Sequence, residues 1–343
     1  MNLDTLLHQF DCNNGLSEII NAICKSSVEI EQLVNRVFLD KTVLISKCIQ
    51  NSSGDEQHKM DILSNEIMIS NLTNSNSCSV LISEENEDAI IVDESHSGNY
   101  IVYFDPLDGS SNIDCNCGVG TIFSIILDND KYKTIENRVL TNGNNIICAG
   151  YILYGGSTDM VIAFKGKGVH RLSFDRNTTE YVHTGILDIT NKNKKVYSIN
   201  ESNYERWDID MKHYIRQYRK QESKYTQRWI GSMVSDIHRT LLYGGMFCYP
   251  WDEKNVNGKL RILYECFPMA MIVEEAGGKA IIANMSKERV LDIVPSHIHQ
   301  RTPVLLGSVE EIEKYEKILD NIINNPPNGN GKWIFDRSNG IGS

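Results

Sequence analysis

One stretch of the sequence, residues 100–112 (YIVYFDPLDGSSN), constrains what this chain can fold into more than any other. It begins with aromatic and β-branched residues, which predict a buried strand, and Pro106 excludes a regular continuation of that strand. A turn at this point can aim the carboxylates of Asp105 and Asp108 at one position, and hard divalent cations prefer such oxygen ligands. Small residues and hydroxyls follow at 109–111, where they suit an anion beside the cation.

The same pattern has a simpler interpretation, because Asp, Pro, Gly and Ser are also the usual residues of turns. A second pair of acids favours the ligand site: Glu84 and Glu85 closely follow the apolar run 78–82. Open α/β sheets place their ligands at strand ends. Two carboxylate pairs at the ends of two predicted strands therefore indicate a metal site.

Composition and charge narrow the class of protein. The 343 residues are 41% hydrophobic and 23% charged, as in a globular chain with one large domain or two ordinary ones. The formal net charge of −11 argues against nucleic-acid binding, which needs clustered Lys and Arg. The start of the sequence lacks a signal-peptide pattern and no window suits a membrane span, so we expect a cytoplasmic protein without a membrane partner.

The 9 cysteines lack the spacing of a zinc site. The pair in Cys115-Asn116-Cys117 is too close for the usual metal or redox pattern. We interpret the cysteines as buried, reduced thiols.

Hydrophobic periodicity and breaker residues divide the chain into two halves near residue 193. The first half holds a predicted helix (16–38), a polar loop (47–59) and a helix for which Asp61 is a candidate N-cap. Its further predicted strands are 120–127, 148–154 and 160–164. In the second half we expect strands at 196–199, 246–249 and 261–265, and helices at 207–219, 234–242, from 268 to the Gly277-Gly278 stop, and at 309–323. A tail from residue 324 is expected to be disordered or an interaction arm.

Four segments carry a resemblance to a known family: LISEE (81–85), FDPLDGSSNID (104–114), GSMV (231–234) and NGKLRILYEC (257–266). They resemble class I fructose-1,6-bisphosphatases, in the superfamily of metal-dependent, lithium-sensitive phosphatases. The short DPLDGS is shared with inositol monophosphatases, whereas the later segments separate the two. The similarity runs from about residue 16 to residue 308. It implies an α/β (α+β) fold, layered α-β-α-β-α, of two mixed-sheet domains (1–193 and 194–325) and a disordered tail (326–343).

The resemblance also implies the reaction, hydrolysis of the 1-phosphate of fructose 1,6-bisphosphate in gluconeogenesis. Two or three Mg²⁺ ions, or Mn²⁺ or Zn²⁺ instead, would be held by Glu84, Asp105, the carbonyl of Leu107, Asp108, Glu265 and Asp55. Crowded carboxylates raise one another's pKa unless cations lie between them. Asp61 and Glu85, together with Asp55 of a mobile loop, would act on the attacking water, and we expect no phosphoenzyme.

For the reacting phosphate, the resemblance implies a cradle of Gly109, Ser110 and Ser111. Lys259 and Arg261 would add positive charge beside it. Taken individually, these two bases would be assigned to the solvated surface.

For the distal phosphate, the family's residues match Asn200, Tyr249 and Arg228, the arginine coming from a neighbouring subunit of a homotetramer. Trp229 and Asn203 stand where the family has tyrosines. An indole can still donate a hydrogen bond, so we expect binding with altered affinity; core filling is the alternative role of this tryptophan. The sugar itself would pack against one apolar residue, Met233.

Other functions stay open. The nearest rival is a sedoheptulose-1,7-bisphosphatase, because its sugar pocket would differ in few contacts. An inositol-phosphate or nucleotide phosphatase fits the segment 257–266 less well. A non-catalytic, sugar-phosphate-sensing regulator should have lost at least one of the acids, and none is missing.

Animal members of the family are inhibited by AMP, and this chain departs from the residues that bind it. The family's Lys-Tyr pair reads Asn99-Tyr100 here, its arginine falls on Leu127, and two loop donors align with Asn13 and Gly15. Each charge-assisted hydrogen bond is worth roughly 1.5–3 kcal/mol, so we expect an AMP-insensitive enzyme. Two nearby bases are an alternative source of positive charge, Lys131 and Lys133.

Overall fold

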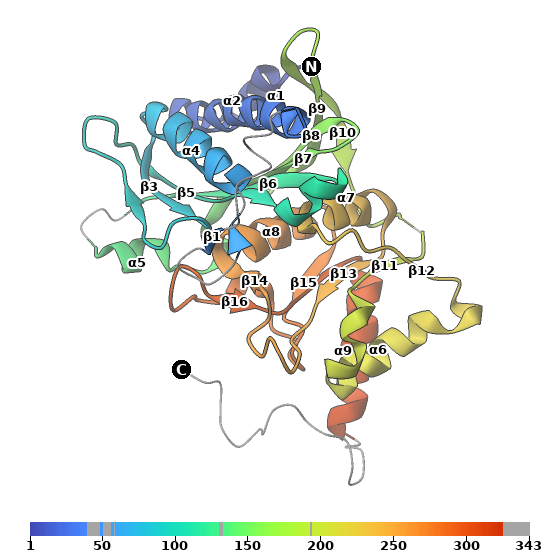
Figure 1. Ribbon diagram of the computed structural model, residues 1–343. Helices are drawn as coiled ribbons and strands as arrows, with labels where there is room; N and C mark the ends of the chain where they lie inside the picture. The colour runs from blue at the N-terminus through green and yellow to red at the C-terminus, as the bar shows by residue number, and fades with distance from the viewer. Residues whose placement is uncertain (40–48, 51–55, 58, 130–132, 193, 325–343) are drawn as a thin grey trace.

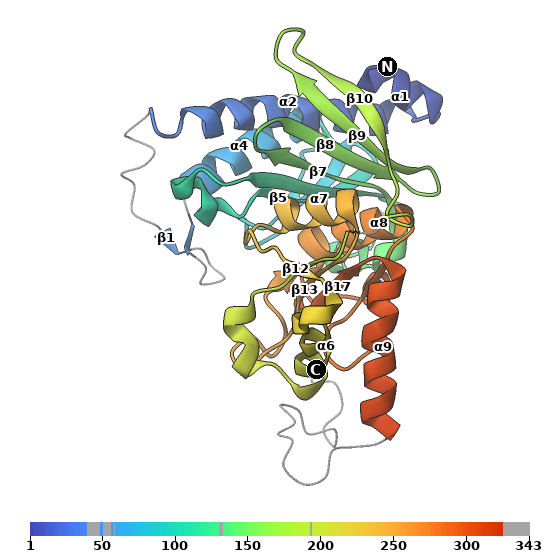
Figure 2. The ribbon, with the colours of Figure 1, turned by 90° about the vertical axis from the view of Figure 1, so that its right-hand side faces the viewer.

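The computed structural model describes residues 1–39, 49–50, 56–57, 59–129, 133–192 and 194–324, with only the backbone of 49–50 and 56–57 (Figure 1). Helices and sheets alternate in five layers, which confirms the predicted fold class (Figures 1 and 2). The outer layer consists of α1 (Leu3–Gln9), α2 (Asn14–Arg36) and α4 (Lys59–Asn74). The middle helices are α7 (Met233–Tyr243) and α8 (Phe267–Glu275), and the far layer consists of α6 (Ile209–Arg219) and α9 (Val309–Asn324).

The first sheet has eight strands in the order β10-β9-β8-β7-β6-β5-β3-β4. Neighbours are antiparallel except for the parallel pair β3 and β5. Its strands are β3 (Cys78–Ser83), β4 (Ile90–Ile91), β5 (Tyr100–Asp108), β6 (Val119–Leu127), β7 (Ile146–Tyr154), β8 (Thr158–Phe164), β9 (Gly168–Asp175) and β10 (Glu180–Leu187).

The second sheet has the order β12-β11-β13-β17-β15 and mixes parallel and antiparallel neighbours. Its strands are β11 (Val196–Ser198), β12 (Thr226–Gln227), β13 (Met246–Tyr249), β15 (Lys279–Ile281) and β17 (Val304–Gly307). Smaller elements are β1 (Ile49–Gln50) paired with β2 (Glu56–Gln57), β14 (Leu260–Arg261) paired with β16 (Arg301–Thr302), and α5 (Ile135–Val139).

Three apolar clusters hold these layers together. One lies between α1, α2, α4 and the first sheet, one around α7 and α8 between the two sheets, and one between the second sheet, α6 and α9. Because α8 is buried on all its faces, its sequence is apolar throughout, FPMAMIVEE, until the acids at its end. Packing against α7 and α8 in the middle layer therefore sets the position of the strand ends of one sheet relative to the other.

Most of the predicted elements are confirmed, including the strand from Tyr100 and the helix that begins beyond residue 232. Two local predictions were wrong. The strand β5 continues past Pro106 to Asp108, with a register shift against β6 between Asp105 and Asp108. The strand expected at 261–265 ends at Arg261, and a π-helical turn (Ile262–Cys266) leads into α8. Asp61, for which an N-cap role was one of two alternatives, lies inside the first turn of α4.

The errors at residues 261–265 and at Pro106 have separate physical causes. The run of residues 262–267 is completely buried, and a fully buried run has no polar alternation that separates a strand from a helix. At Pro106 the bulge accommodates the missing N–H donor. The Pro106 carbonyl accepts a 2.8 Å hydrogen bond from Thr121 Oγ1.

The interpretation of all cysteines as buried was also wrong. Cys115 and Cys117 are exposed, and Cys12 and Cys24 are half-buried. The other described cysteines, Cys78, Cys148, Cys248 and Cys266, are buried. All eight within the described ranges are free thiols. The polar loop 47–59 lies mostly outside the described residues, and the tail 326–343 lies wholly outside them.

Candidate metal and phosphate site

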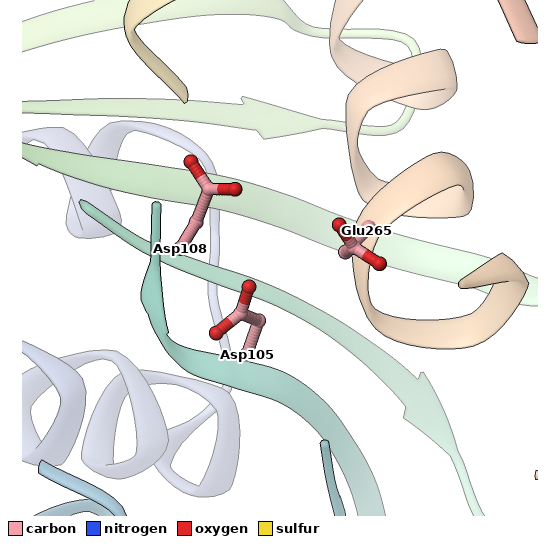
Figure 3. Close-up of side chains that lie close together, drawn as sticks. All are labelled: Asp105, Asp108 and Glu265. Atoms are coloured by element: carbon pink, nitrogen blue, oxygen red, sulfur yellow. The ribbon is translucent and has the colours of Figure 1, made fainter. Parts of the chain in front are cut away.

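Three buried carboxylates from two distant parts of the chain meet between β5 and the turn that precedes α8. Asp105, Asp108 and Glu265 place carboxylate oxygens within 4.8 Å of one another, and we call these residues the acid cluster (Figure 3). Their exposed fractions are 2%, 8% and 6%. The bulge in β5 contributes the two aspartates, and the π-helical turn contributes the glutamate. The structure therefore brings together the acids expected at 105, 108 and 265.

Each carboxylate of the acid cluster is oriented by backbone or side-chain donors. Asp105 Oδ1 accepts from the Leu107 N–H at 2.9 Å, and Glu265 Oε2 accepts from the Arg261 N–H at 2.6 Å. Asp108 Oδ2 accepts from Ser232 Oγ at 2.7 Å and from a backbone N–H in the first turn of α7 at 3.0 Å. Burial alone would disfavour the charged form of these carboxyl groups. Their hydrogen-bond donors favour the charged form and hold its oxygens in place.

Burial raises the pKa values of all three carboxyl groups of the acid cluster, and a nearby acid adds to the rise in each, which for Asp108 is Asp236. For Asp105 and Glu265, burial is the largest cause and the neighbouring Glu84 the next. The three carboxylates fit a hard divalent cation. Their oxygens lie close enough to bind one ion, and its positive charge would offset the repulsion between them. Within the described ranges, this is the one group of three or more such ligands.

Glu84 joins the acid cluster from the end of β3. Its backbone N–H donates to the Phe104 carbonyl at 3.1 Å, which continues the parallel pairing of β3 with β5. Burial raises the pKa of Glu84 to about 7; Arg261 and a hydrogen bond with Asp105 lower it, while Asp108 and Asp61 raise it. Those electrostatic partners place this carboxyl group beside the cluster.

Asp61 and Glu85, the acids expected to act on the attacking water, lie near the acid cluster. Asp61 Oδ2 accepts from Ser110 Oγ at 3.3 Å, and its charge raises the pKa of Glu84. Glu85 raises the pKa of Asp105, and its N–H donates to Ser83 Oγ at 3.2 Å. Asp55, expected both as a ligand and beside the water, lies outside the described residues.

A glycine–serine turn (residues 109–111) continues directly from the acid cluster into a short 3-10 helix, Ser110–Cys115. Gly109 caps this helix with a φ of 74°, in the left-handed region that favours glycine. A Cβ atom at Gly109 would lie 2.6 Å from Ser232 Cβ, so the close approach of α7 also requires a glycine. The turn places small residues and hydroxyls beside the carboxylates.

Comparisons with known proteins agree with this arrangement. The family model of the fructose-1-6-bisphosphatase N-terminal domain matches residues 2–185, and that of the C-terminal domain matches residues 190–320. The chain belongs to the fructose-1,6-bisphosphatase family. It is therefore a phosphatase, a hydrolase whose substrate is a sugar bisphosphate.

Named relatives cover most of the chain. The chloroplastic fructose-1,6-bisphosphatase of Spinacia oleracea is 42% identical over 323 residues, 89% of this chain and 77% of that protein. The cytosolic enzyme of Solanum tuberosum is 44% identical over 271 residues, 78% of each chain. The crystal structure of Leishmania major fructose-1,6-bisphosphatase in holo form superposes with a TM-score of 0.87 and 39% identity, covering 93% of this chain and 99% of that one.

The bases expected beside the reacting phosphate occupy different settings. Arg261 is buried, 5% exposed, and Nη1 donates to the His299 carbonyl at 3.2 Å, while its charge lowers the pKa of Glu84. Lys259 Nζ lies 5.8 Å from the centre of the Tyr249 ring. The structure thus places Arg261 at the acid cluster and Lys259 beside an expected distal residue.

The residues expected at the distal phosphate form a second group. Asn200, Asn203 and Tyr249 lie around one narrow crevice, which has no room for a water molecule. The Trp229 ring stacks on Phe247, with centroids 6.0 Å apart and planes 6° apart. Its centroid is 5.8 Å from that of Tyr249. Trp229 is therefore both a packing residue and a neighbour of Tyr249.

Arg228 and Met233 flank the start of α7. Arg228 is exposed, and its Nη1 donates to the Gln227 carbonyl at 3.0 Å. Met233, 3% exposed, opens α7 and lies in the cluster of apolar residues between the sheets.

Two residues that position the site in this bisphosphatase-family chain were not predicted from the sequence. Ser232 donates to Asp108; the signals for it were its place in the segment GSMV (231–234) and before a predicted helix, which is typical of an N-cap. Asp236, fully buried, accepts from the N–H groups of Ile230 and Gly231 at 3.2 and 3.1 Å and from Arg239 at 2.5 Å. No local pattern distinguishes it from other helical acids.

Proposed function

We propose that this chain hydrolyses the 1-phosphate of fructose 1,6-bisphosphate with Mg²⁺ at the acid cluster, in gluconeogenesis. The observation that carries the proposal is the approach of three buried carboxylates within 4.8 Å, immediately before the glycine–serine turn. Mn²⁺ and Zn²⁺ are alternative occupants, because both accept carboxylate ligands. Two or three ions would be shared among Asp105, Asp108, Glu265, Glu84, the Leu107 carbonyl and Asp55.

A bound divalent cation would lower the pKa of the attacking water and offset the charge that develops on the phosphoryl and leaving oxygens. Asp61 and Glu85 orient the water, and one of them accepts its proton. Asp55 is proposed to assist. The Ser110 hydroxyl, 3.3 Å from Asp61 Oδ2, supports this arrangement, because it places the phosphate turn beside the proposed proton acceptor.

The rest of the substrate is held by groups that do not react. Gly109, Ser110 and Ser111 donate to the transferred phosphate, and Lys259 and Arg261 add positive charge. The distal phosphate is bound by Asn200, Asn203, Trp229, Tyr249 and a partner subunit's arginine equivalent to Arg228, while Met233 packs against the sugar. The grouping of Asn200, Asn203 and Tyr249 around one crevice supports this assignment.

The proposal is tested by measuring phosphate release from fructose 1,6-bisphosphate, sedoheptulose 1,7-bisphosphate and inositol monophosphate in parallel. Each substrate is assayed with Mg²⁺, Mn²⁺, Zn²⁺ and chelator. We expect Mg²⁺-dependent hydrolysis of the fructose substrate to exceed that of inositol monophosphate by orders of magnitude. A faster reaction with the sedoheptulose substrate would reassign the sugar, and equal rates with inositol monophosphate would refute a bisphosphate site.

We also propose that AMP does not regulate this enzyme at physiological concentrations. Tyr100 Oη donates to Asn13 Oδ1 at 2.7 Å, and the same oxygen caps α2 by accepting from the Leu16 N–H at 2.9 Å. Leu127 pairs with Tyr100 across β5 and β6, so an apolar side chain stands where a family arginine would approach. A Cβ at Gly15 would lie 2.9 Å from the Tyr100 ring.

These contacts support weak nucleotide binding, because the loss of two cationic partners costs roughly 3–6 kcal/mol, on the order of two to four decades in affinity. Lys133 is the described base that could substitute; Lys131 lies outside the described residues. Titrating AMP into the phosphatase assay tests this proposal. Half-inhibition at micromolar AMP would contradict it.

The remaining proposals concern organisation and place. Two domains, residues 1–193 and 194–325, are supported by the two sheets and by the two family models. A homotetramer is proposed from Arg228, and light scattering of the purified chain would measure it. Cytosolic relatives support a cytoplasmic location, whereas a plastid location of a fluorescent fusion would agree with the chloroplastic ones. Among the described helices, none has the length and apolar character needed to cross a membrane.

A further inference from the structure

His299, in the loop before β16, is half-buried beside the segment that leads to Glu265. Arg261 Nη1 donates to the His299 carbonyl at 3.2 Å. The Ile262 N–H donates to the carbonyl of the following residue, Gln300, at 2.8 Å. These contacts use only the backbone of the loop, so they hold it in place and leave the imidazole available for other partners.

The imidazole of His299 joins two distant segments through its two nitrogens. Nε2 lies 3.1 Å from the Glu87 carbonyl oxygen, and Nδ1 lies 2.8 Å from Tyr264 Oη. Because a carbonyl can only accept, Nε2 carries a proton; the neutral ring then accepts at Nδ1, and the Tyr264 hydroxyl is the donor. We call Tyr264, His299 and the Glu87 carbonyl the histidine bridge. It spans 212 positions of the sequence between His299 and Glu87.

Both ends of the histidine bridge lie next to proposed site residues. Glu87 comes two residues after Glu85, in the loop that follows β3 and begins with Glu84. Tyr264 immediately precedes Glu265 in the π-helical turn. Burial raises the pKa of Tyr264, and the Glu84 charge is the next largest cause, which agrees with a hydroxyl close to these acids.

The other side of the loop after β3 is attached to α4. Asn65 Nδ2 donates to Asn86 Oδ1 at 2.8 Å, and Asn65 Oδ1 accepts from Ser83 Oγ at 2.7 Å. The same helix carries Asp61. The loop is therefore held to the first half of the chain by α4 and to the second half by the imidazole of His299.

We propose that His299 is a positioning residue, which holds Glu84 and Glu85 in place relative to Glu265. It acts through the Glu87 carbonyl and Tyr264, not by contact with the reacting atoms. Without the Nε2 donor, the loop after β3 loses its attachment to the segment that presents Glu265. Carboxylates from the two halves of the chain then no longer keep the spacing that one cation needs. Weaker metal binding follows, a consequence that rests on the proposed function.

The bridge is tested on the full chain without substrate, by hydrogen–deuterium exchange of the peptide that contains residues 84–90 and by calorimetric titration with Mn²⁺. His299→Ala should raise exchange in this peptide and weaken Mn²⁺ binding severalfold, because it removes a hydrogen bond between the two segments. His299→Gln places an amide nitrogen near the Nε2 position and should keep both values near those of the wild type. His297→Ala, at an exposed position of the same loop, is the matched control and should behave as the wild type.

Two results would overturn this role for His299. One is wild-type exchange and wild-type Mn²⁺ affinity in folded His299→Ala. The other is an equal loss in His299→Gln, because the packing of the ring would then matter and not its donor. Circular dichroism melting verifies that each variant is folded. If His299→Ala does not fold, His299→Asn replaces it, since asparagine can accept from Tyr264 but is too short to reach the Glu87 carbonyl.

Activity measurements then separate this role from a role in substrate binding. In the hydrolysis of fructose 1,6-bisphosphate, His299→Ala should need severalfold more Mg²⁺ for half-activation and have a lower kcat, with KM nearly unchanged. A raised KM with unchanged kcat and Mg²⁺ dependence would contradict the proposal. If the wild type hydrolyses no substrate, the proposed function fails, while exchange and Mn²⁺ affinity still decide the role of His299.

Discussion

Ser232 Oγ donates a 2.7 Å hydrogen bond to Asp108 Oδ2, and this contact joins the N-cap of α7 to the end of β5. The same carboxylate oxygen accepts from the Val234 N–H in the first turn of the helix. A helix N-terminus favours negative charge, and both donors lower the pKa of Asp108 against the effect of burial. α7 thus favours the charged form of this buried carboxylate, the form that the proposed metal site requires.

We predict that Ser232→Ala weakens Mg²⁺ activation. Removing a hydrogen bond to a charged group costs roughly 1.5–3 kcal/mol. The Mg²⁺ concentration at half-activation should therefore rise at least about tenfold. The variant also loses a helix cap, so Thr134→Ala at the N-cap of α5 is the control. Both variants should lose some stability, and only Ser232→Ala should change the Mg²⁺ dependence. An unchanged Mg²⁺ titration would show that Asp108 does not need this donor.

Glu265→Gln should abolish turnover and stabilise the metal-free protein. The amide can still accept from the Arg261 N–H, while one buried charge disappears from a cluster in which burial and Glu84 raise the pKa of Glu265. Each pKa unit corresponds to about 1.4 kcal/mol. Differential scanning calorimetry in chelator should therefore show a higher melting temperature, and added Mg²⁺ should narrow the difference.

The control for that experiment is Glu253→Gln, which removes one charge at an exposed position. It should retain both activity and the wild-type melting temperature. Near-wild-type turnover of Glu265→Gln at saturating Mg²⁺ would mean that the ligand assignment is wrong.

His238 should make the protein lose stability in acid. The pKa of His238 is lowered to about 4, mainly by burial and then by the Arg171 charge, while Asp159 opposes the shift. When the pH falls below the ordinary histidine pKa of about 6.5, this histidine binds a proton in the unfolded state but not in the folded state. Between about pH 6.5 and 4, the free energy of unfolding therefore falls by about 1.4 kcal/mol per pH unit, roughly 3 kcal/mol in all.

His238→Asn should remove this slope, because asparagine places an amide near the Nδ1 position that contacts Tyr151 Oη at 2.8 Å. Urea unfolding at several pH values measures it. Since carboxyl groups titrate in both proteins, the difference between wild type and variant isolates the histidine. His213→Asn, at an exposed position, should keep the wild-type slope. Parallel pH dependences for wild type and His238→Asn would contradict the prediction.

Arg228→Ala should raise KM more than it lowers kcat, because the proposed contact is with the phosphate that does not react. Lys220→Ala, which removes another exposed base, should change neither. If Arg228 serves a neighbouring site, mixing Arg228→Ala with Asp105→Asn should form hybrid sites that lack both defects. An oligomer without a gain in specific activity after subunit exchange would argue against a shared site.

The local features of this protein could be predicted from sequence because their causes are local. Aromatic and β-branched residues indicated the strand from Tyr100, and the Asp105-Pro106-Leu107-Asp108 order indicated two carboxylates at its end. Helical spacing indicated α2 and α9. Family resemblance then named Glu265 as a partner of these acids, although nothing in the residues themselves showed that segments 157 positions apart (265 − 108) would meet.

Other features depend on contacts between distant segments. The apolar run 262–267 is compatible with a strand or a helix, and its burial between the two sheets decides for the π-helical turn that presents Glu265. The Ser232–Asp108 contact depends on the close approach of α7 to Gly109. The exposure of Cys115 and Cys117 depends on where their turn lies in the fold. The sequence determined the helices and strands and the chemistry at their ends. Packing between the two sheets decided which of those ends meet, because the burial of apolar surface brings segments together whatever their separation in the sequence.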